Sequence, residues 1–458
     1  MKISLKLIAW AVVLAVLLVA LPVGAAAETQ HETAAEAVAS IKAGWNLGNT
    51  LDSNGEWIAL YTAGRPSDYE TAWGNPVTTR AMLHAVKAAG FNAVRVPVTY
   101  AQHLDSGANI DPVWLNRVAE VIGYVLDEGM YCVTNLHHDT GEGELGWLKA
   151  SAVDLPVTGA KLQKVWGQIA ERFKDYDNHL LFESFNEILN TSNEWSNPSA
   201  GDLDTVNQLN QLFVDTVRAT GGGNAERNLI VNTYAAAVDY SIINAFVLPN
   251  DTVQEHLIAE VHCYSPWEFT SEPAWMSPTR WKDTWDSDLE ASLDVIFNNL
   301  NNRFTKNNIP LIMGEFGCED KNNESERAKW ASYFVTKAAE IGVPCFYWDT
   351  STMRLFNRST LQFEFPLIAA ALATPASEEL QITGIDVGNA EFTIQASGGV
   401  GALSYSFYIL KGGKVYYSSA YSQSSKFSFN LTESGVYQLR GYVQDELGNR
   451  VVVSMHNV

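Results

Sequence analysis

Residues 180–187 read LLFESFNE, and this stretch guides the interpretation of the whole chain. It begins as a short apolar run without the alternation of a half-exposed strand, which is typical of a parallel strand buried on both faces. It ends in Asn186 and Glu187, so polar groups follow directly on a buried strand. Strands of this kind normally alternate with helices, and the flanking sequence has that organisation.

Seven further runs have the same character, and helical patterns separate most of them. The runs cover residues 43–49, 91–98, 131–138, 228–234, 257–264, 310–317 and 345–350. Between two of them Met82, Val86 and Ala89 share one helical face, and the pattern is weakest between the fifth and sixth runs. Eight alternations of strand and helix predict a (β/α)8 TIM barrel. An open doubly wound sheet is the alternative, but no GxGxxG turn follows the first run.

The composition changes near residues 373–379, beyond which short β-like runs alternate with glycine turns. About 80 residues with seven such runs predict a C-terminal all-β domain, an immunoglobulin-like sandwich. We therefore expect a barrel domain over 28–373, a short linker over 374–379 and the sandwich over 380–458.

The first 27 residues have the pattern of a secretory signal peptide. Lys2 and Lys6 precede an apolar run over 7–23, and small residues follow it. A transmembrane anchor is the alternative, because the run is nearly long enough to span a bilayer. The signal predicts a secreted protein that leaves the membrane after cleavage.

Composition and charge limit the partners of the chain. It has 458 residues, with 30 Lys+Arg against 52 Asp+Glu and a net charge of −22, which argues against nucleic acid and anionic membrane surfaces. The balance fits a soluble protein that binds neutral ligands, and we expect a monomer. Four cysteines are too few for a disulfide scaffold. We expect them to be buried free thiols in or just after strands: Cys132, Cys263, Cys318 and Cys345.

Polar and aromatic residues gather at the carboxyl ends of the predicted strands, where the function of such barrels lies. Glu187 and Glu315 follow the fourth and seventh runs, so they can face one another across the barrel mouth. Paired carboxylates serve glycoside hydrolysis, in which one donates a proton and the other attacks the anomeric carbon. The other residues at these ends are Asn46, Arg95, His137, His138, Asn186, His262, Tyr264 and Trp348.

An ordered set of motifs over about residues 30–372 resembles glycoside hydrolase family 5, and more narrowly its endoglucanase and xyloglucanase branch. The motifs are GWNLGNT at 44–50, ETAWGNP at 70–76, RVP at 95–97, NLHHD at 135–139, FNE at 185–187, VHCY at 261–264, GEFG at 314–317 and FYW at 346–348. The resemblance implies a retaining mechanism with Glu187 as general acid/base and Glu315 as nucleophile. It also implies that Asn186 binds the sugar 2-hydroxyl.

The same resemblance assigns supporting roles around the two acids. His262 and Tyr264 would hold the carboxylates in place, with Tyr264 nearest Glu315. Arg95 beside Glu315 would favour the ionised form of that acid. His137 matches the invariant histidine of the family.

Because neighbours on a strand alternate, we expect one of His137 and His138 to point into the site and the other outward, and we favour His137 inward. Zinc could in principle bind His137, His138, Asp139 and His262. However, there is no HExxH helix, and two adjacent histidines on a strand cannot easily share one metal. We therefore predict neither metal nor cofactor.

Aromatic residues are the main candidates for sugar contacts. Trp348 is expected to form the floor of the −1 subsite by stacking on a sugar face. Thirteen of the 14 tryptophans lie between residues 28 and 372 and none in 373–458, which fits an aromatic cleft in the barrel. The tyrosines of the tail could bind sugar, or they could be core and cross-strand pairs. Candidates for the other subsites are Asn46, Trp73, His138, Trp147 and Trp267.

These observations predict a secreted, retaining endo-β-1,4-glucanase whose partner is a β-glucan polysaccharide. The substrates would be cellulose, mixed-linkage β-glucan or xyloglucan. A β-mannanase or a dedicated xyloglucanase on the same fold is one alternative. A non-catalytic polysaccharide-binding protein is another, but a pure binder has no need of the pair Glu187 and Glu315.

Overall fold

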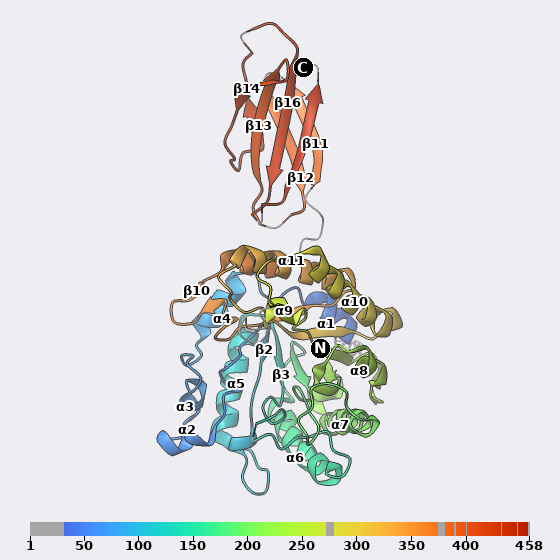
Figure 1. The fold of residues 1–458 in the computed structure, drawn as a ribbon. Coiled ribbons are helices and arrows are strands. Elements are labelled where there is room, and N and C mark those ends of the chain that lie inside the picture. Colours follow the sequence, from blue (N-terminus) through green and yellow to red (C-terminus); the bar gives the residue numbers. More distant parts are fainter. Residues whose placement is uncertain are drawn as a thin grey trace, which may run out of the picture. The chain divides into compact units, whose positions relative to one another are not determined.

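Eight parallel strands close into a barrel in the order β1 to β8 (Figure 1). The computed structural model describes residues 32–143, 145–271, 279–373, 381–388, 391–399, 401–431, 433–446 and 448–456. The strands are β1 (Gly44–Asn46), β2 (Ala93–Val96), β3 (Tyr131–Thr134), β4 (Leu180–Glu183), β5 (Leu229–Asn232), β6 (Leu257–His262), β7 (Leu311–Phe316) and β8 (Cys345–Trp348). The pairing of β8 with β1 confirms the predicted barrel, because an open sheet leaves its first and last strands unpaired.

Helices surround the strands and fill the connections between them (Figure 1). They are α1 (Ala34–Ser40), α2 (Glu56–Tyr61), α3 (Pro66–Glu70), α4 (Arg80–Ala88), α5 (Pro112–Asp127), α6 (Leu155–Phe173), α7 (Ala200–Ala219), α8 (Tyr240–Ala245), α9 (Trp267–Thr270), α10 (Ser287–Arg303), α11 (Glu324–Glu340) and α12 (Pro366–Ala373). The start of α5 shows why the sequence folds this way: Asp111 accepts a hydrogen bond from Val113 N, and Pro112 occupies the first turn. The faint helical pattern between the fifth and sixth strands corresponds to the short α8. None of the described helices combines the length and apolar character that a membrane span requires.

The strands end one to four residues earlier than the apolar runs predict. β3 ends at Thr134 and β4 at Glu183, whereas the runs continue to residues 138 and 187. Beyond the strands, hydrogen bonds join neighbouring loops, and one of them runs from Asn186 N to the Leu136 carbonyl at 2.8 Å. His137, His138, Asn186 and Glu187 therefore lie on loops just above the barrel.

The amino end of the barrel is closed by an apolar plug. Ala34, Ala37 and Val38 of α1 and Ile41 just after it pack with Val133, Leu181, Ile230, Ile258, Ile312 and Phe346 from the strands. Gly44 is required here, because a Cβ at this position would lie 2.3 Å from the Phe346 ring. Function is thereby confined to the opposite end.

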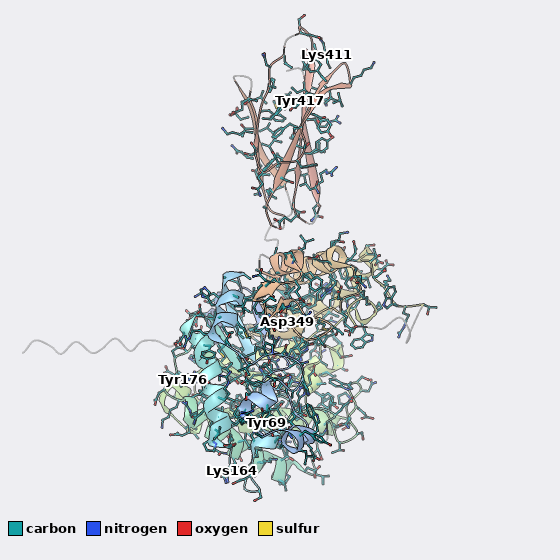
Figure 2. The ribbon with its side chains drawn as sticks, turned by 90° about the vertical axis from the view of Figure 1, so that its left-hand side faces the viewer. Tyr69, Lys164, Tyr176, Asp349, Lys411 and Tyr417 are labelled. Atoms are coloured by element: carbon teal, nitrogen blue, oxygen red, sulfur yellow. The ribbon has the colours of Figure 1, made fainter. Side chains whose placement is uncertain are left out.

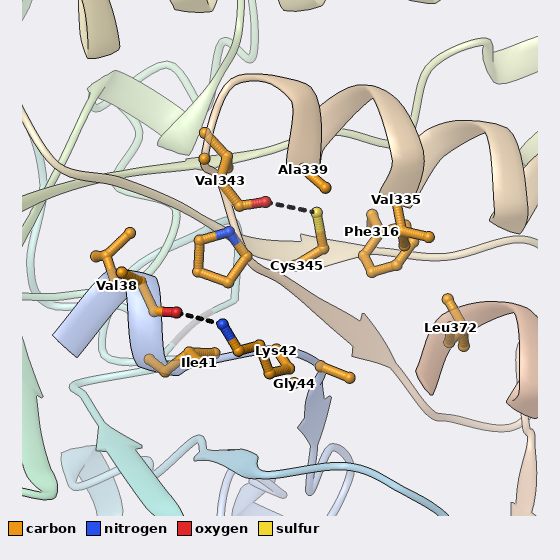
Figure 3. A pocket seen from close by; sticks show the side chains of 14 residues that line it. Val38, Ile41, Lys42, Gly44, Phe316, Val335, Ala339, Val343, Cys345 and Leu372 are labelled. Atoms are coloured by element: carbon orange, nitrogen blue, oxygen red, sulfur yellow. Dashed lines mark hydrogen bonds between the residues drawn. The ribbon is translucent and has the colours of Figure 1, made fainter. Parts of the chain in front are cut away.

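A hollow near the starts of β1 and β8 is lined mainly by apolar groups, among them Val38, Ile41 and Cys345 (Figure 3). Its lining contains no carboxylate, so it does not carry the chemistry expected of Glu187 and Glu315.

The four cysteines are buried free thiols, as predicted. Cys132 lies in β3 and Cys345 in β8, while Cys263 and Cys318 follow β6 and β7.

The C-terminal residues form two antiparallel sheets, which confirms the predicted all-β domain. One has the order β11-β12-β15 and the other β14-β13-β16-β17. Tyr405 and Phe407 belong to the core between the sheets, whereas Tyr408 and Tyr442 form an edge-to-face pair with ring centroids 5.3 Å apart. Tyr417, which is labelled in Figure 2, stacks on the ring of Phe427 at a centroid distance of 4.9 Å. The strands are β11 (Gln381–Gly388), β12 (Glu391–Ser397), β13 (Ser404–Lys411), β14 (Lys414–Ser418), β15 (Lys426–Ser428), β16 (Tyr437–Gln444) and β17 (Arg450–His456), besides a small pair in the barrel region, β9 (Phe356–Asn357) and β10 (Gln362–Phe363).

The proposed signal peptide over 1–27 and the linker over 374–379 lie outside the described residues. The domain boundaries therefore stay predictions.

Candidate active site

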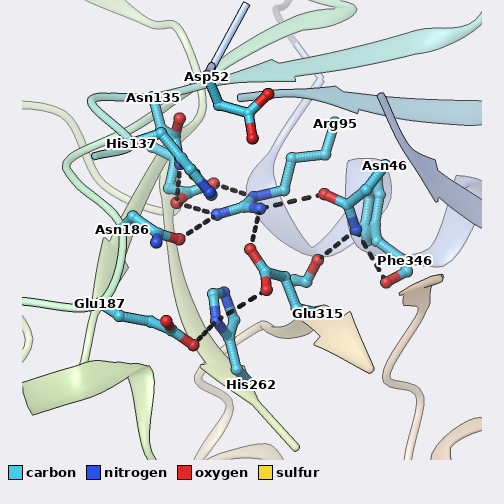
Figure 4. Close-up of polar contacts among 12 residues, drawn as sticks. Asn46, Asp52, Arg95, Asn135, His137, Asn186, Glu187, His262, Glu315 and Phe346 are labelled. Carbon is cyan, nitrogen blue, oxygen red and sulfur yellow. Dashed lines mark hydrogen bonds and ion pairs between the residues drawn. The ribbon is translucent and has the colours of Figure 1, made fainter. Parts of the chain in front are cut away.

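Arg95 is the centre of the polar network at the carboxyl end of the barrel (Figure 4). It lies fully buried on β2 and donates to Glu183 through Nε at 2.6 Å and Nη2 at 2.8 Å. Nη1 donates to Glu315 Oε1 at 2.7 Å and to Asn46 Oδ1 at 3.0 Å, and Nη2 donates to Asn186 Oδ1 at 2.9 Å. Burial opposes the charge, but the carboxylates of Glu183 and Glu315 outweigh burial and raise the pKa of Arg95. The guanidinium fork is a permanent cation that fixes groups from β1, β2, β4 and β7 together.

Glu187 and Glu315 meet across the mouth of the barrel. His262 Nδ1 lies 2.9 Å from Glu187 Oε1 and 3.7 Å from Glu315 Oε2. A carboxylate oxygen of Glu187 lies within 4.8 Å of one from Glu315. The Glu187 side chain is 21% exposed and the Glu315 side chain 5% exposed, so Glu187 faces the solvent side.

The neighbours of the two acids have defined protonation states. Tyr264 donates its hydroxyl to Glu315 Oε2 at 2.8 Å, and burial together with the charge of Glu315 raises the pKa of Tyr264, so the phenol keeps its proton. Burial opposes a charge on His262, but Glu315 and Glu187 outweigh it and raise the pKa of His262 to about 10. The His262 ring therefore carries a proton on both nitrogens at neutral pH.

His137 and His138 both border the site, so the prediction that His138 points outward is wrong. Their rings lie 4.5 Å apart, and His138 also contacts the Trp73 ring at 5.4 Å. Strand alternation does not apply because β3 has ended at Thr134. Burial, followed by the charge of His138, lowers the pKa of His137, whose ring stacks on Trp348 at a centroid distance of 5.5 Å.

Two groups of described residues bring potential metal ligands close together: Asp52 with His137 and His138, and Glu187 with His262 and Glu315. In the second group both oxygens of Glu315 already accept hydrogen bonds, from Arg95 Nη1 at 2.7 Å and from the Tyr264 hydroxyl at 2.8 Å. In the first, Asp52 already accepts hydrogen bonds from Asn49 N at 2.9 Å and Thr50 N at 2.6 Å. The chemistry of these donor sets gives no support for a metal.

Comparison with known proteins gives this arrangement a family. Residues 51–354 match the model described as Cellulase (glycosyl hydrolase family 5). The chain belongs to this family. It is a glycoside hydrolase of the cellulase family, and its relatives include endoglucanases and xyloglucan-binding enzymes.

Three relatives define the similarity of this family 5 enzyme. Endoglucanase A of Clostridium longisporum is 39% identical over 350 residues, which are 74% of this chain; the chain spans 65% of the length of that protein. A broad-specificity endoglucanase from Ruminococcus champanellensis, solved with bound cellotriose, is 38% identical with a TM-score of 0.69 over 75% of this chain and 98% of its own. A family 5 enzyme from Prevotella bryantii B14, solved as a mutant with a xyloglucan tetradecasaccharide, is 40% identical with a TM-score of 0.68, over 75% and 98% respectively.

The candidate subsite tryptophans of the family 5 enzyme differ in accessibility. Trp348, at the end of β8, is partly buried, and Gly48 leaves room for its ring, because a Cβ there would lie 3.0 Å away. Trp267, at the start of α9, is 52% exposed. Trp147 is partly buried, donates to Asp139 Oδ1 at 2.7 Å and has Lys161 Nζ 4.1 Å from its ring centroid, so one ring face is already covered.

Asn46 does not fit its predicted role as a substrate-binding residue. It is fully buried, and its amide donates to the Gly314 and Phe346 carbonyls at 2.9 and 3.0 Å while its oxygen accepts from Arg95. These bonds leave Asn46 as a support for Arg95.

The sequence patterns did not predict three buried acids of the site. Glu183 pairs with Arg95, Glu260 lies 3.5 Å from the same guanidinium, and Asp52 lies 3.8 Å from His138. The signal was present for two of them, because Glu183 and Glu260 each interrupt an apolar strand, where an unpaired acid is rarely buried.

Proposed function

We propose that this enzyme is a secreted, retaining endo-β-1,4-glucanase that uses Glu187 as general acid/base and Glu315 as nucleophile. The observation that carries the proposal is the approach of the two carboxylates, whose nearest oxygens lie within 4.8 Å around His262. Retaining glycosidases have carboxyl groups about 5–5.5 Å apart, whereas inverting enzymes need roughly 6.5–9.5 Å to admit a water molecule. The separation supports retention.

In the first step a carboxylate oxygen of Glu315 attacks C1 of the sugar in the −1 subsite. The bond between C1 and the glycosidic oxygen breaks, and that oxygen takes the electron pair together with the proton of Glu187. Arg95 and Tyr264 orient the Glu315 carboxylate, since each donates to a different oxygen. The product is a glycosyl-enzyme ester and a shortened chain with a free 4-hydroxyl.

In the second step water attacks C1 while Glu187 accepts a proton from it. The ester bond between C1 and Glu315 breaks, and Glu315 leaves as a carboxylate. The greater exposure of Glu187 supports this role, because the attacking water must enter beside it.

Four side chains are suited to hold the sugar. The amide oxygen of Asn186 accepts from Arg95, which leaves the amide NH2 as a donor for the 2-hydroxyl. Trp348, backed by His137, offers a flat ring for stacking. Trp267 and Trp73 would extend the cleft, with His138 beside Trp73.

Cellulose chains, mixed-linkage β-glucan and xyloglucan are the proposed substrates. Support comes from the bound cellotriose of the Ruminococcus champanellensis enzyme and the bound xyloglucan oligosaccharide of the Prevotella bryantii enzyme. The pattern of residues 1–27 supports secretion, and the proposal treats the chain as a monomer without metal or cofactor. A β-mannanase or dedicated xyloglucanase is the alternative among enzymes.

Hydrolysis assays on these β-glucans and on mannan test the proposal. We expect internal cleavage of β-1,4-glucans, with Glu187→Gln and Glu315→Gln inactive but still able to bind. Proton NMR should show the β-anomer as the first product. An initial α-anomer would refute the retaining mechanism, and full activity in both variants would refute the assignment of the two acids. If both variants also bound the polysaccharide as the parent does, the chain would be a binding protein and the activity would come from a contaminating enzyme.

A further inference from the structure

Glu260 is a buried acid that the mechanism above does not use. It lies on β6, two residues before His262, and is fully buried. Its Oε2 accepts from Asn232 Nδ2 at 3.2 Å. Its Oε1 lies 3.4 Å from His262 Nε2 and 3.5 Å from Arg95 Nε.

Neither of the two facing atoms, Glu260 Oε1 and His262 Nε2, has a hydrogen-bond partner among the described residues. At 3.4 Å the two atoms form an ion pair, which offsets part of the cost of burying them. The opposite nitrogen, His262 Nδ1, faces Glu187 Oε1 at 2.9 Å. The imidazole ring is therefore held between Glu260 and Glu187.

The neighbouring strand is shaped to admit this carboxyl group. Gly314 directly precedes Glu315 on β7, and a Cβ at Gly314 would lie 1.5 Å from Glu260 Oε1. A side chain at position 314 and the observed position of Glu260 exclude each other. The missing side chain at Gly314, next to Glu315, thus leaves the space that the Glu260 carboxyl group occupies.

Charged groups surround Glu260 and His262 from several strands. Arg95 and Glu183 face them from β2 and β4, Glu315 from β7, and Glu187, His137 and Tyr264 from the loops. Two cations, Arg95 and His262, thus face four acids. Burial, followed by the charge of Glu183, raises the pKa of Glu260 to about 7, so Glu260 is the acid that gains a proton near neutrality.

We propose that Glu260 is a positioning residue for the reaction: it orients the His262 ring toward Glu187, and its negative charge stabilises the proton that His262 and Glu187 share. This inference rests on the proposed role of Glu187. Glu260 touches neither of the reacting atoms and acts only through His262.

The proposal predicts a specific dependence on pH. When Glu260 is ionised, its charge strengthens proton binding by the pair of His262 and Glu187. Glu260→Gln resembles the protonated carboxyl group at every pH. Its activity should therefore match that of the parent at acid pH. At alkaline pH the pair of His262 and Glu187 should bind its proton more weakly than in the parent. The alkaline limb of kcat/KM should therefore move to lower pH.

The experiment compares the pH profiles of kcat/KM for the parent, Glu260→Gln and the control Glu70→Gln. Glu70 is an equally buried acid, bound by Arg117 Nε at 2.6 Å and not in contact with His262. We expect Glu260→Gln to stay within about twofold of the parent near pH 5.5 and to fall about tenfold near pH 8, which equals a shift of about one unit. Glu70→Gln should keep the shape of the parent profile.

A profile of Glu260→Gln that parallels the parent would overturn the proposal. The Glu187→Gln and Glu315→Gln variants tell this failure apart from failure of the proposed function, because their inactivity would leave the mechanism standing. Should Glu260→Gln not fold, imidazole ¹⁵N NMR of the parent, assigned with His262→Asn, provides the second measurement. We expect both ring nitrogens of His262 to stay protonated at about pH 8, and a neutral ring at that pH would equally overturn the proposal.

Discussion

Arg95 Nη1 donates to Glu315 Oε1 at 2.7 Å, and this bond joins β2 to β7 across the interior of the barrel. The opposite edge of the same guanidinium is held by both oxygens of Glu183. Glu315 is therefore held by the Arg95 guanidinium, which Glu183 in turn holds in place.

Arg95→Lys should nearly abolish activity although it keeps the charge. Lysine offers a point charge and cannot donate to Glu183, Glu315 and Asn186 in one plane. We expect kcat to fall by about 10²-fold or more, together with a lower melting temperature, since a buried pair is disturbed. Arg354→Lys is the control, because Arg354 pairs with Glu364 on the surface. Parent-like kcat in Arg95→Lys would contradict the need for the fork.

Tyr264→Phe removes the hydroxyl that donates to Glu315 Oε2 and changes little else. We expect kcat to fall by about 10- to 10²-fold, because the carboxylate loses one of its two orienting bonds. KM should change little, since the phenol holds the nucleophile and not the sugar. Steady-state kinetics on a soluble β-glucan measure both, and a rise in KM with unchanged kcat would assign Tyr264 to substrate binding instead.

Trp348→Ala should impair binding at the −1 subsite. The ring stacks on that of His137 at a centroid distance of 5.5 Å. Loss of stacking should lower kcat/KM by about 10²-fold, of which Trp348→Phe should recover a part. Isothermal titration of oligosaccharide into Glu187→Gln and into the corresponding double variant separates binding from chemistry. Equal affinity in both would exclude Trp348 from the subsite.

The sequence predicted the strands and the two acids because both have local signals. Apolar runs mark the strands, and Glu187 and Glu315 each follow one. The sequence could not predict how the loops above the strands turn, so the predicted outward orientation of His138 was wrong. It also could not show that Asn46 is buried against Arg95, so Asn46 was predicted to bind the sugar. Nor does spacing along the chain show that Glu183 and Glu260 pair with Arg95, since such contacts depend on the closure of the barrel.

The free energy of unfolding should depend on pH through His103, which is buried against Trp114. Its ring stacks on Trp114 at 3.7 Å, and burial lowers its pKa to about 4. The unfolded chain binds a proton at about pH 6.5, before the folded chain does, so stability is present above that pH and is lost as pH falls through about 4. Full loss corresponds to about 3 kcal/mol.

His103→Phe should flatten this dependence, because phenylalanine binds no proton in either state. Urea unfolding between about pH 7 and pH 4 gives the free energy of each protein, and the difference between parent and variant isolates His103 from other acids such as Asp139. Parallel curves for the two proteins would show that His103 does not titrate as the buried position implies.

Gly314 and Glu260 should be strongly coupled in a double-mutant cycle. Gly314→Ala places a Cβ where Glu260 Oε1 lies, 1.5 Å away, so the carboxyl group must leave its place between His262 and Arg95. We expect this single change to destabilise the protein by about 2–3 kcal/mol. In a chain that already carries Glu260→Ala the space is empty, so adding Gly314→Ala should cost far less. Thermal unfolding of the four proteins gives the coupling energy, and additive effects would mean that the two side chains do not compete for this space.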